Sequence, residues 1–522
     1  MQPNTDLQAA EFFLATFIRN WGWTIYKETH FTPTSRPIDA GTEKSMSENQ
    51  PWSGLRWASP VALVIFLSGL LACGGGSKSS TPIAGGGGGG VAVAPFFFGM
   101  HINQQSSPFP STVGVAIAGV RLWDTHTSWA TTNTSNGSYD WTDLDSHVNQ
   151  ALANKADILY DFGRTPAWAQ CASNDPLCGS GNSTITCAYS VIPNEGGPGE
   201  CFPPNDLHVD GSGPNQHWID WVTAAATRYK GKISYYEIWN EPNIPGMWQG
   251  TDAQLVRMAG DARCILIGDK GCNSQSTYAQ KGIDPAAHLL TPAFTSPVDD
   301  LAAYLITPLN GGVGVGGSLV DIVAFHGYPG PNPAEQVVTI YDKVTSVLVG
   351  QALRNVPVFD TEGSWGARNG VSNLSDPDQQ AAFTARYLLV QQSAGIQRLY
   401  WYGWDLTSGD GTLWNGSGLT MAGVAYQQTE VWVSGATLTT PCSPKGTIWL
   451  CGYTRAGGYQ GLVVWDASQT CGNGSCSVSN YTLPSSPQFT QYQDVAGNTH
   501  SVSGSTVPIG AKPILIETGK IP

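Results

Sequence analysis

The sequence predicts an α/β protein in which eight parallel strands and their helices form one (β/α)8 TIM barrel, followed by an all-β, sandwich-like module. Between residues 96 and 420, short apolar segments alternate with helix-like segments, which is the pattern of a parallel α/β fold. Eight strand-like segments fit into that stretch, and eight is the number that one barrel requires. The later residues instead show short strand-like runs separated by turn residues, which indicates an all-β module.

The expected barrel strands are short apolar segments that end near a turn or a polar residue. They are 96–103, 119–123, 157–162, 233–239, 288–292, 321–325, 356–361 and 398–403. Helix signals lie between them. Trp218, Trp221 and Tyr229 fall on one helical face that stops at Gly231, and the Ser-Asp-Pro-Asp run at 375–378 is a helix cap.

The C-terminal module is expected over residues 421–522, as one closing helix followed by short strands. Strand-like runs occur at 447–453, 461–465, 481–483 and 513–517, with Gly, Ser, Asn and Pro turns between them. Its expected role is to pack on the barrel, and a separate sugar-binding role is the alternative.

The N-terminal part of the sequence has the pattern of an export signal. Residues 1–45 are polar and aperiodic and are interpreted as a non-native extension, with Met46 as the start. Residues 46–72 have the basic and apolar regions of a signal peptide, too short for a stable membrane span. Leu-Leu-Ala-Cys at its end predicts lipidation of Cys73, with 73–95 as a flexible tether. The alternative is a cleaved signal with an incidental Cys. The prediction is an exported lipoprotein, periplasmic or on the cell surface, held in the outer or cytoplasmic membrane.

Eleven cysteines become ten when Cys73 is set aside. The remaining ten form close neighbours in sequence: 171/178, 187/201, 264/272, 442/451 and 471/476. An even set of local pairs in an exported chain predicts five disulfides. The four cysteines within 171–201 leave other pairings open. A metal site is the alternative interpretation, but no His lies at ligand spacing among these cysteines.

Composition excludes several classes of function. A net charge of -14 with 25 basic residues argues against nucleic acid and anionic membrane surfaces as partners. The sequence has no zinc spacing, phosphate loop or dinucleotide fingerprint, so we expect no metal and no organic cofactor. Nineteen Trp are a high number. Most belong to the core, but flat indole rings also suit stacking against sugar rings.

Residues 233–243, ISYYEIWNEPN, carry the first candidate for chemistry. An apolar strand ends in Asn240-Glu241-Pro242, so a carboxyl group is placed where a parallel barrel carries its active site. A solvated loop Glu beside a turn-forming Pro would explain Asn-Glu-Pro alone. The longer string Trp-Asn-Glu-Pro-Asn behind an aromatic strand is far more specific.

A second carboxyl group ends the expected strand 356–361, in the run VPVFDTEGSW. Hydrolysis of a glycosidic bond uses two carboxyl groups, one to protonate the leaving oxygen and one to attack C1. Glu362 is the better partner for Glu241 because it ends the strand. Asp360 is a rival, and strand alternation places it on the same face as Glu362 but deeper.

These two strand ends resemble the clan A retaining glycosidases, which are (β/α)8 barrels whose fourth strand ends in Asn-Glu. Glycoside hydrolase family 39, or a neighbouring family, is the nearest match. The resemblance implies that Glu241 is the acid/base, that Glu362 is the nucleophile and that Asn240 hydrogen-bonds the sugar 2-OH. The seventh strand departs from the Thr-Glu-Trp form common in that family, which leaves the sugar open.

Other strand ends resemble the same clan. Arg121 matches an Arg that holds the nucleophile ionised by lowering its pKa. His326 and Tyr328 match an aromatic pair beside the nucleophile, although His326 alone would also suit a core position. Trp401 matches a Trp that serves as a sugar platform, with Trp404 as a second candidate.

Two weaker sets complete the candidates. The run from Phe162 to Trp168 resembles the Thr-Pro-x-Trp that follows the third strand in family 39. Trp168 is then either a subsite wall or a loop anchor. His101 and Asn103 end the first expected strand.

The predicted function is a retaining glycosidase that cleaves an extracellular poly- or oligosaccharide by double displacement, with carbohydrate as its partner. A rival of another class is an inactive barrel that only binds glycans, but a binder needs no two convergent carboxyl groups. A transglycosylase would use the same residues with a sugar acceptor.

Overall fold

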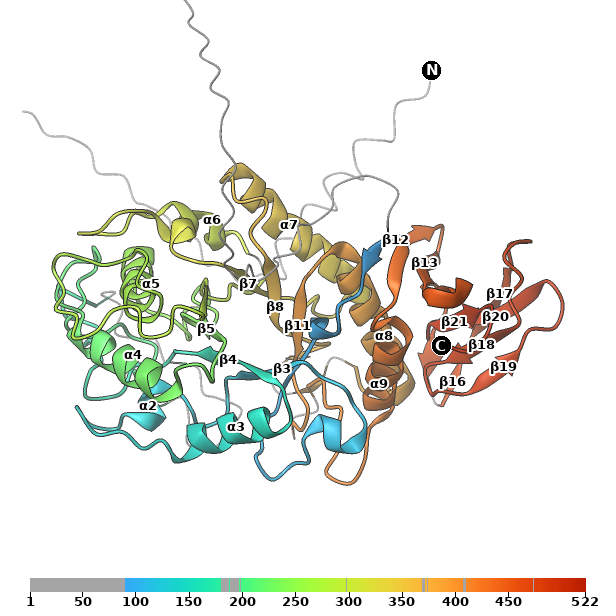
Figure 1. Cartoon of the computed structure of the whole chain (residues 1–522), viewed down its shortest axis with the longest axis horizontal. Helices are drawn as coiled ribbons and strands as arrows, with labels where there is room; N and C mark the ends of the chain where they lie inside the picture. Colours follow the sequence, from blue (N-terminus) through green and yellow to red (C-terminus); the bar gives the residue numbers. More distant parts are fainter. Residues whose placement is uncertain are drawn as a thin grey trace, which may run out of the picture. The chain divides into compact units, whose positions relative to one another are not determined.

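The computed structural model describes residues 90–522, except 180–186, 188–196, 198, 297, 369–370, 373, 407–409 and 473 (Figure 1). The expected extension, the signal peptide, Cys73 and most of the tether lie outside the described residues. Within the described part of the chain, no helix is both long and apolar enough to span a membrane.

Eight parallel strands form the barrel, in the spatial order β6-β5-β4-β3-β2-β11-β8-β7. They are β2 Phe98–His101, β3 Gly119–Leu122, β4 Asp157–Asp161, β5 Tyr235–Glu237, β6 His288–Leu290, β7 Val323–His326, β8 Val358–Gly363 and β11 Arg398–Trp401. Parallel bridges from Leu290 to Ile322 and from Phe294 to Phe325 link the two ends of this order, so the sheet is nearly closed. The eight expected strands are confirmed, with ends shifted by a few residues.

Helices lie outside the strands (Figure 1). They are α2 Trp129–Thr132, α3 Thr142–Ala153, α4 Gln216–Tyr229, α5 Asp252–Leu266, α6 Asp300–Ile306, α7 Val337–Gly350, α8 Pro377–Ala394 and α9 Met421–Val433. The apolar face predicted for α4 is buried, including Trp218 and Trp221. The predicted cap of α8 is Asp376, whose side chain accepts hydrogen bonds from the backbone N–H groups of the first turn.

Side chains fill the inside of the barrel. An inner cluster contains Leu159, Leu290, Ala293, Ile322, Ala324, Phe359 and Tyr400. Arg398 lies beside the Tyr400 ring, with its guanidinium carbon 5.4 Å from the ring centre, and donates to Asp157 at 2.8 Å. A filled interior leaves the carboxyl ends of the strands as the place for a site.

The C-terminal module is built on a seven-stranded antiparallel sheet, in the order β1-β12-β13-β14-β21-β18-β19. These strands are β1 Val91–Ala92, β12 Thr437–Lys445, β13 Ile448–Thr454, β14 Gln460–Asp466, β18 Gln491–Asp494, β19 Thr499–Ser501 and β21 Ile514–Glu517. A separate antiparallel pair of strands, β17 Val478–Thr482 and β20 Thr506–Gly510, accompanies this sheet. Because β1 pairs with β12, the last residues of the expected tether belong to this sheet instead.

Helix α8 is buried around most of its circumference because it contacts both the barrel helices and the module. Arg386 of α8 forms a two-point ion pair with Glu335, with Nε–Oε1 at 2.7 Å and Nη2–Oε2 at 2.5 Å. Trp465 of β14 donates its indole N–H to the same Glu335 oxygen at 2.7 Å. This buried network attaches the module to the barrel and fits the expected packing role.

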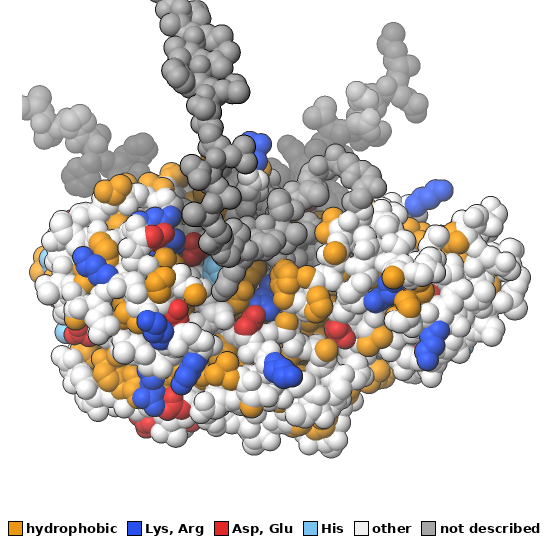
Figure 2. Space-filling view, viewed as in Figure 1, with side chains coloured by type: hydrophobic (Ala, Val, Ile, Leu, Met, Phe, Trp, Pro, Cys, Tyr) orange, Lys and Arg blue, Asp and Glu red, His pale blue; other side chains and the backbone are white. Residues whose placement is uncertain are grey.

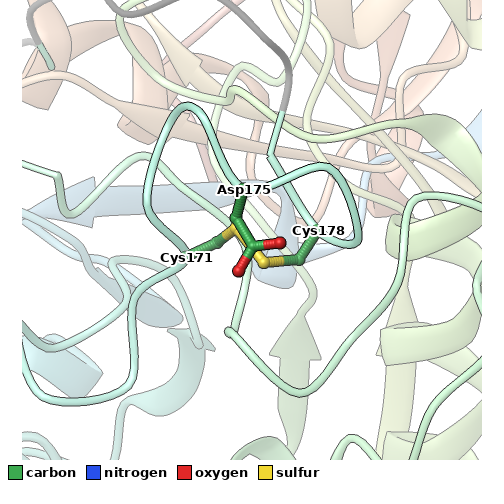
Figure 3. A group of neighbouring side chains, drawn as sticks. All are labelled: Cys171, Asp175 and Cys178. Atoms are coloured by element: carbon green, nitrogen blue, oxygen red, sulfur yellow. A yellow bond between two sulfur atoms is a disulfide. The ribbon is translucent and has the colours of Figure 1, made fainter.

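All five expected disulfides are present, and their local pairing is confirmed, including the pairs 171–178 and 187–201. Figure 3 shows the bond between Cys171 and Cys178, with Asp175 beside it. These three residues have the spacing of a metal site. Because their sulfurs are joined to each other, no thiolate is left to bind an ion.

Charged side chains on the face drawn in Figure 2 are scattered singly or in small groups among polar and apolar atoms. The described residues of this face form no continuous basic stripe of the kind that a nucleic-acid surface needs.

Candidate active site

Glu241 and Glu362 come from β5 and β8, which β6 and β7 separate, and meet at the carboxyl end of the barrel. Glu241 follows β5, with Asn240 bridged to Ala293 beyond β6, and Glu362 lies near the end of β8. Both are buried, with exposures of 8% and 7%. Glu241 has a left-handed backbone with φ of 45°, a strained conformation that typically occurs at functional positions.

The imidazole of His326, at the end of β7, joins the two carboxyl groups. Its Nδ1 lies 2.9 Å from Glu241 Oε1 and 3.9 Å from Glu362 Oε1. One oxygen of each Glu and this nitrogen all lie within 4.8 Å of one another. Retaining glycosidases hold their carboxyl groups about 5–5.5 Å apart and inverting enzymes about 6.5–9.5 Å apart. The close approach therefore fits retention.

Arg121 of β3 contacts only one of the two catalytic candidates. Its Nη1 donates to Glu362 Oε2 at 2.8 Å. The rest of the guanidinium faces Glu237 at 2.7 Å, Asp161 at 3.0 Å and Asn240 Oδ1 at 2.8 Å. Burial alone would lower the pKa of Arg121, but these carboxyl groups more than offset this and raise it. Arg121 is thus a permanent cation beside Glu362.

Burial acts on the protonation of both glutamates. It raises the pKa of Glu241 to about 7, with Thr295 and Arg121 opposing the rise and Asp124 adding to it. Burial also raises the pKa of Glu362, with His326 and Arg121 opposing the rise and Glu241 adding to it. Arg121 lowers the pKa of Glu362, as expected, but burial has the larger effect, so the net pKa lies above its usual value.

The expected aromatic pair after β7 lies at the glutamates. Tyr328 donates its hydroxyl to Glu362 Oε1 at 2.9 Å. Burial lowers the pKa of His326 to about 4, so its ring is neutral near pH 7. His101, at the end of β2, has its Nε2 3.0 Å from the carbonyl oxygen of Thr361.

Trp401 does not face the site, which corrects the expected platform. It is fully buried, packs against Trp365 and Tyr387, and donates its indole N–H to Gly411. The next residue faces the site instead. Tyr402 contacts Asp124 and His101, which both follow or end barrel strands beside the site.

Sequence reasoning missed Tyr402. Its hydroxyl donates to Asp124 Oδ2 at 2.8 Å, and its ring packs on His101 with 5.0 Å between centres. Trp404, the second platform candidate, is fully buried against Trp414 and does not serve as a platform either.

Asp360 does not share a face with Glu362. A register shift lies between the pairs Phe325–Asp360 and His326–Glu362, so strand alternation is broken there. Asp360 instead accepts hydrogen bonds from Tyr387 of α8 and from the backbone N–H of residue 327, both at 2.9 Å. It is removed as a rival nucleophile.

Trp168 lies against α2 and α4. Its indole N–H donates to the carbonyl of Asn133 at 2.7 Å, and its ring meets His217 edge-on at 5.0 Å. Of the two roles left open for Trp168, these contacts favour the loop anchor.

Sequence reasoning also missed Asp161, Glu237 and Asp124. Asp161 and Glu237 are carboxyl groups inside apolar strands, which was itself a visible signal. Asp124 follows β3 with a left-handed φ of 56°. Besides the cysteine group, the described residues contain one further cluster with metal-like spacing, Glu241, His326 and Glu362.

No family model matches the sequence. No curated protein sequence matches it either. Solved structures do match in fold. A family 39 glycoside hydrolase from Bacteroides cellulosilyticus WH2 has a TM-score of 0.55 at 14% identity, covering 81% of each chain. The GH39 enzyme from Xanthomonas axonopodis pv. citri has a TM-score of 0.54 at 14% identity, covering 82% of this chain and 95% of its own.

A monomeric beta-xylosidase from Caulobacter crescentus CB15 has a TM-score of 0.53 at 15% identity, covering 82% of this chain and 97% of its own. The barrel and its β module are thus similar in fold to family 39 glycoside hydrolases of clan A.

Proposed function

We propose that the protein is a retaining glycoside hydrolase in which Glu241 is the acid/base and Glu362 the nucleophile. The observation that carries this proposal is the pair of buried carboxyl groups that converge on His326 while only one of them is paired with Arg121. Two carboxyl groups with different electrostatic surroundings are what double displacement requires.

The unequal surroundings assign the two roles. Glu241 contacts neutral His326 and has a pKa of about 7, so near neutral pH it can deliver a proton to the leaving oxygen. Glu362 accepts hydrogen bonds from Arg121 and Tyr328, which stabilise its anion for attack at C1. Once the leaving group departs, Glu241 is a carboxylate and can take a proton from the water that releases the sugar.

A glycan-binding protein is the rival function. Binding would be served by open aromatic platforms, but Trp401 and Trp404 are both buried. Transglycosylation uses the same carboxyl groups, and only the acceptor differs. We favour hydrolysis because water is the acceptor that requires no further subsite.

A substrate screen tests the proposal. Purified residues 74–522 are assayed on aryl glycosides, beginning with β-xylosides because one similar structure is a beta-xylosidase, and on plant and microbial polysaccharides. We expect release of aglycone or reducing sugar, and no release by Glu362→Ala. If glycans bind to the protein but none of them is cleaved, the rival function is supported.

We also propose that Cys73 anchors the protein to a membrane after export. The sequence around Cys73 and the five disulfides, which fit an extracellular or periplasmic location, support this. Cys73→Ser should move the full chain from the membrane fraction to the soluble fraction. A mature N-terminus at a residue other than 73 would contradict the anchor without affecting the catalytic proposal.

A further inference from the structure

A second pair of carboxyl groups lies beside Arg121 and takes no part in the steps above. Asp161 ends β4 and Glu237 ends β5, and the two are direct partners in adjacent parallel strands. Both side chains are fully buried. Both accept hydrogen bonds from Arg121, Glu237 at 2.7 Å and Asp161 at 3.0 Å. One guanidinium therefore connects this pair to Glu362.

The charges of this cluster do not balance if every acid is ionised. Arg121 carries one positive charge and faces three buried carboxyl groups: Asp161, Glu237 and Glu362. Buried anions without a partner are strongly unfavourable, so at least one of these groups keeps its proton.

The hydrogen bonds indicate which group keeps it. Glu237 Oε2 faces both Nε and Nη2 of Arg121, as suits a carboxylate. Its other oxygen, Oε1, is buried and has no donor among the described residues. Among the described residues, the donors to Asp161 are Nη2 of Arg121 and the N–H of Gly163. The side chain of Asp161 lies within hydrogen-bonding reach of the Glu237 carboxyl group, so a proton on Asp161 would supply a donor that this group lacks.

We propose that Asp161 is a neutral acid that donates its proton to Glu237, so that the two carboxyl groups share one proton and Arg121 serves Glu237 and Glu362. Asp161 and Glu237 are then positioning residues that act through Arg121. Burial and the adjacent charge of Glu237 shift the pKa of Asp161 well above its usual range, in the direction that this arrangement requires.

The groups that face this cluster from other elements supply no compensating charge. Burial lowers the pKa values of His101 from β2 and of His326 from β7, so both rings are neutral near pH 7. Glu241 and Asp124 bring further carboxyl groups. Arg164 lies 3.7 Å from Asp124 and pairs with it. Tyrosines complete the surroundings and stay neutral because burial raises their pKa values: Tyr328 and Tyr402.

The shared proton affects the nucleophile, and this consequence rests on the proposed function. An anion at Asp161 would compete for Arg121 and repel the charge on Glu362, so Glu362 would lose its proton only at higher pH. With Asp161 neutral, one anion, Glu237, competes for Arg121. The pH at which Glu362 ionises should therefore depend on Glu237 and not on Asp161.

The pH dependence of kcat/KM tests this difference, whatever the change in kcat. Asp161→Asn keeps a neutral donor toward Glu237, so its acid limb should stay where the wild-type limb lies. Glu237→Gln removes the competing anion, so its acid limb should move to lower pH by about one unit. If the acid limb of Asp161→Asn also moves to lower pH, Asp161 is ionised in the wild type and the proposal is overturned.

Infrared difference spectra locate the proton without any activity, so they separate this proposal from the proposed function. At pH 7, Asp161→Asn should remove intensity from the carbonyl stretch of protonated carboxyl groups. Loss from the carboxylate bands would instead overturn the shared proton. Asp360→Asn is a positive control for this band, because Asp360 is an equally buried strand residue and burial raises its pKa to about 7, so its replacement should remove part of the same carbonyl stretch at pH 7. An Asp161→Asn protein that does not fold would also count against the proposal, because the amide mimics the neutral acid.

Discussion

The loss of activity caused by replacing Glu241 with alanine is expected to depend on the leaving group of the substrate. A sugar alkoxide needs a proton as it departs, whereas an activated phenolate can leave without one. Glu241→Ala should therefore lose activity on a polysaccharide and still form the glycosyl-enzyme from an activated aryl glycoside. Glu362→Ala should be inactive on both, because no nucleophile remains to attack C1.

The size of the loss follows from the surroundings of Glu241. Burial raises its pKa to about 7, so at pH 6 about nine-tenths of the molecules carry the proton, against about 3% at the usual pKa of 4.5. General acid catalysis contributes about 10²–10⁴-fold. Glu241→Ala should lower kcat/KM on the polysaccharide by that factor, or about 3–5 kcal/mol of barrier.

Azide provides the assay that separates the two roles. In Glu241→Ala it should restore turnover of the aryl glycoside by attacking the glycosyl-enzyme, giving the anomer of the substrate. In Glu362→Ala it should attack the substrate directly and give the opposite anomer. The products are identified by proton NMR. Equal loss on both substrates in both mutants, with no rescue, would refute this reasoning, and the reverse pattern would mean that the roles are exchanged.

Three further predictions follow from the same contacts. The kcat/KM profile should be bell-shaped: Glu241 must be protonated, so activity falls as pH rises through about 7, and Glu362 must be ionised, so activity falls on the acid side at a pH above its usual 4.5. A descending limb that persists in Glu241→Gln would contradict this. Arg386→Met leaves buried Glu335 without its ion-pair partner and should destabilise the protein by about 3–5 kcal/mol, measured by denaturant unfolding, whereas the double change with Glu335→Leu should recover much of the loss. Tyr402→Phe should raise KM and leave the melting temperature nearly unchanged, because the Tyr402 hydroxyl forms its hydrogen bond at the site. A lower melting temperature with an unchanged KM would show that Tyr402 has a structural role.

Sequence reasoning recovered the features that depend on local pattern. The eight strands, the α8 cap and the five disulfides are encoded in apolar runs, capping residues and short cysteine spacings. It failed where a strand departs from regular alternation. The shift between Phe325 and His326 turns Asp360 outward, and no residue pattern marks it. The prediction for Trp401 failed for another reason: it rested on the resemblance, and the sequence does not show which face of the strand this side chain occupies.

The assignment of acid and nucleophile finally depends on long-range contacts that no sequence spacing reveals. Arg121 lies 241 positions from Glu362 along the chain, yet its guanidinium reaches that carboxyl group at 2.8 Å. Glu241 contacts His326, and burial keeps the ring of His326 neutral near pH 7. If the two glutamates exchanged roles, the acid would have to hold its proton beside a permanent cation, and the nucleophile would have to carry its charge beside a neutral ring. Both changes oppose the electrostatics, so the geometry that brings the carboxyl groups together also supports the proposed roles, with Glu241 as the proton donor.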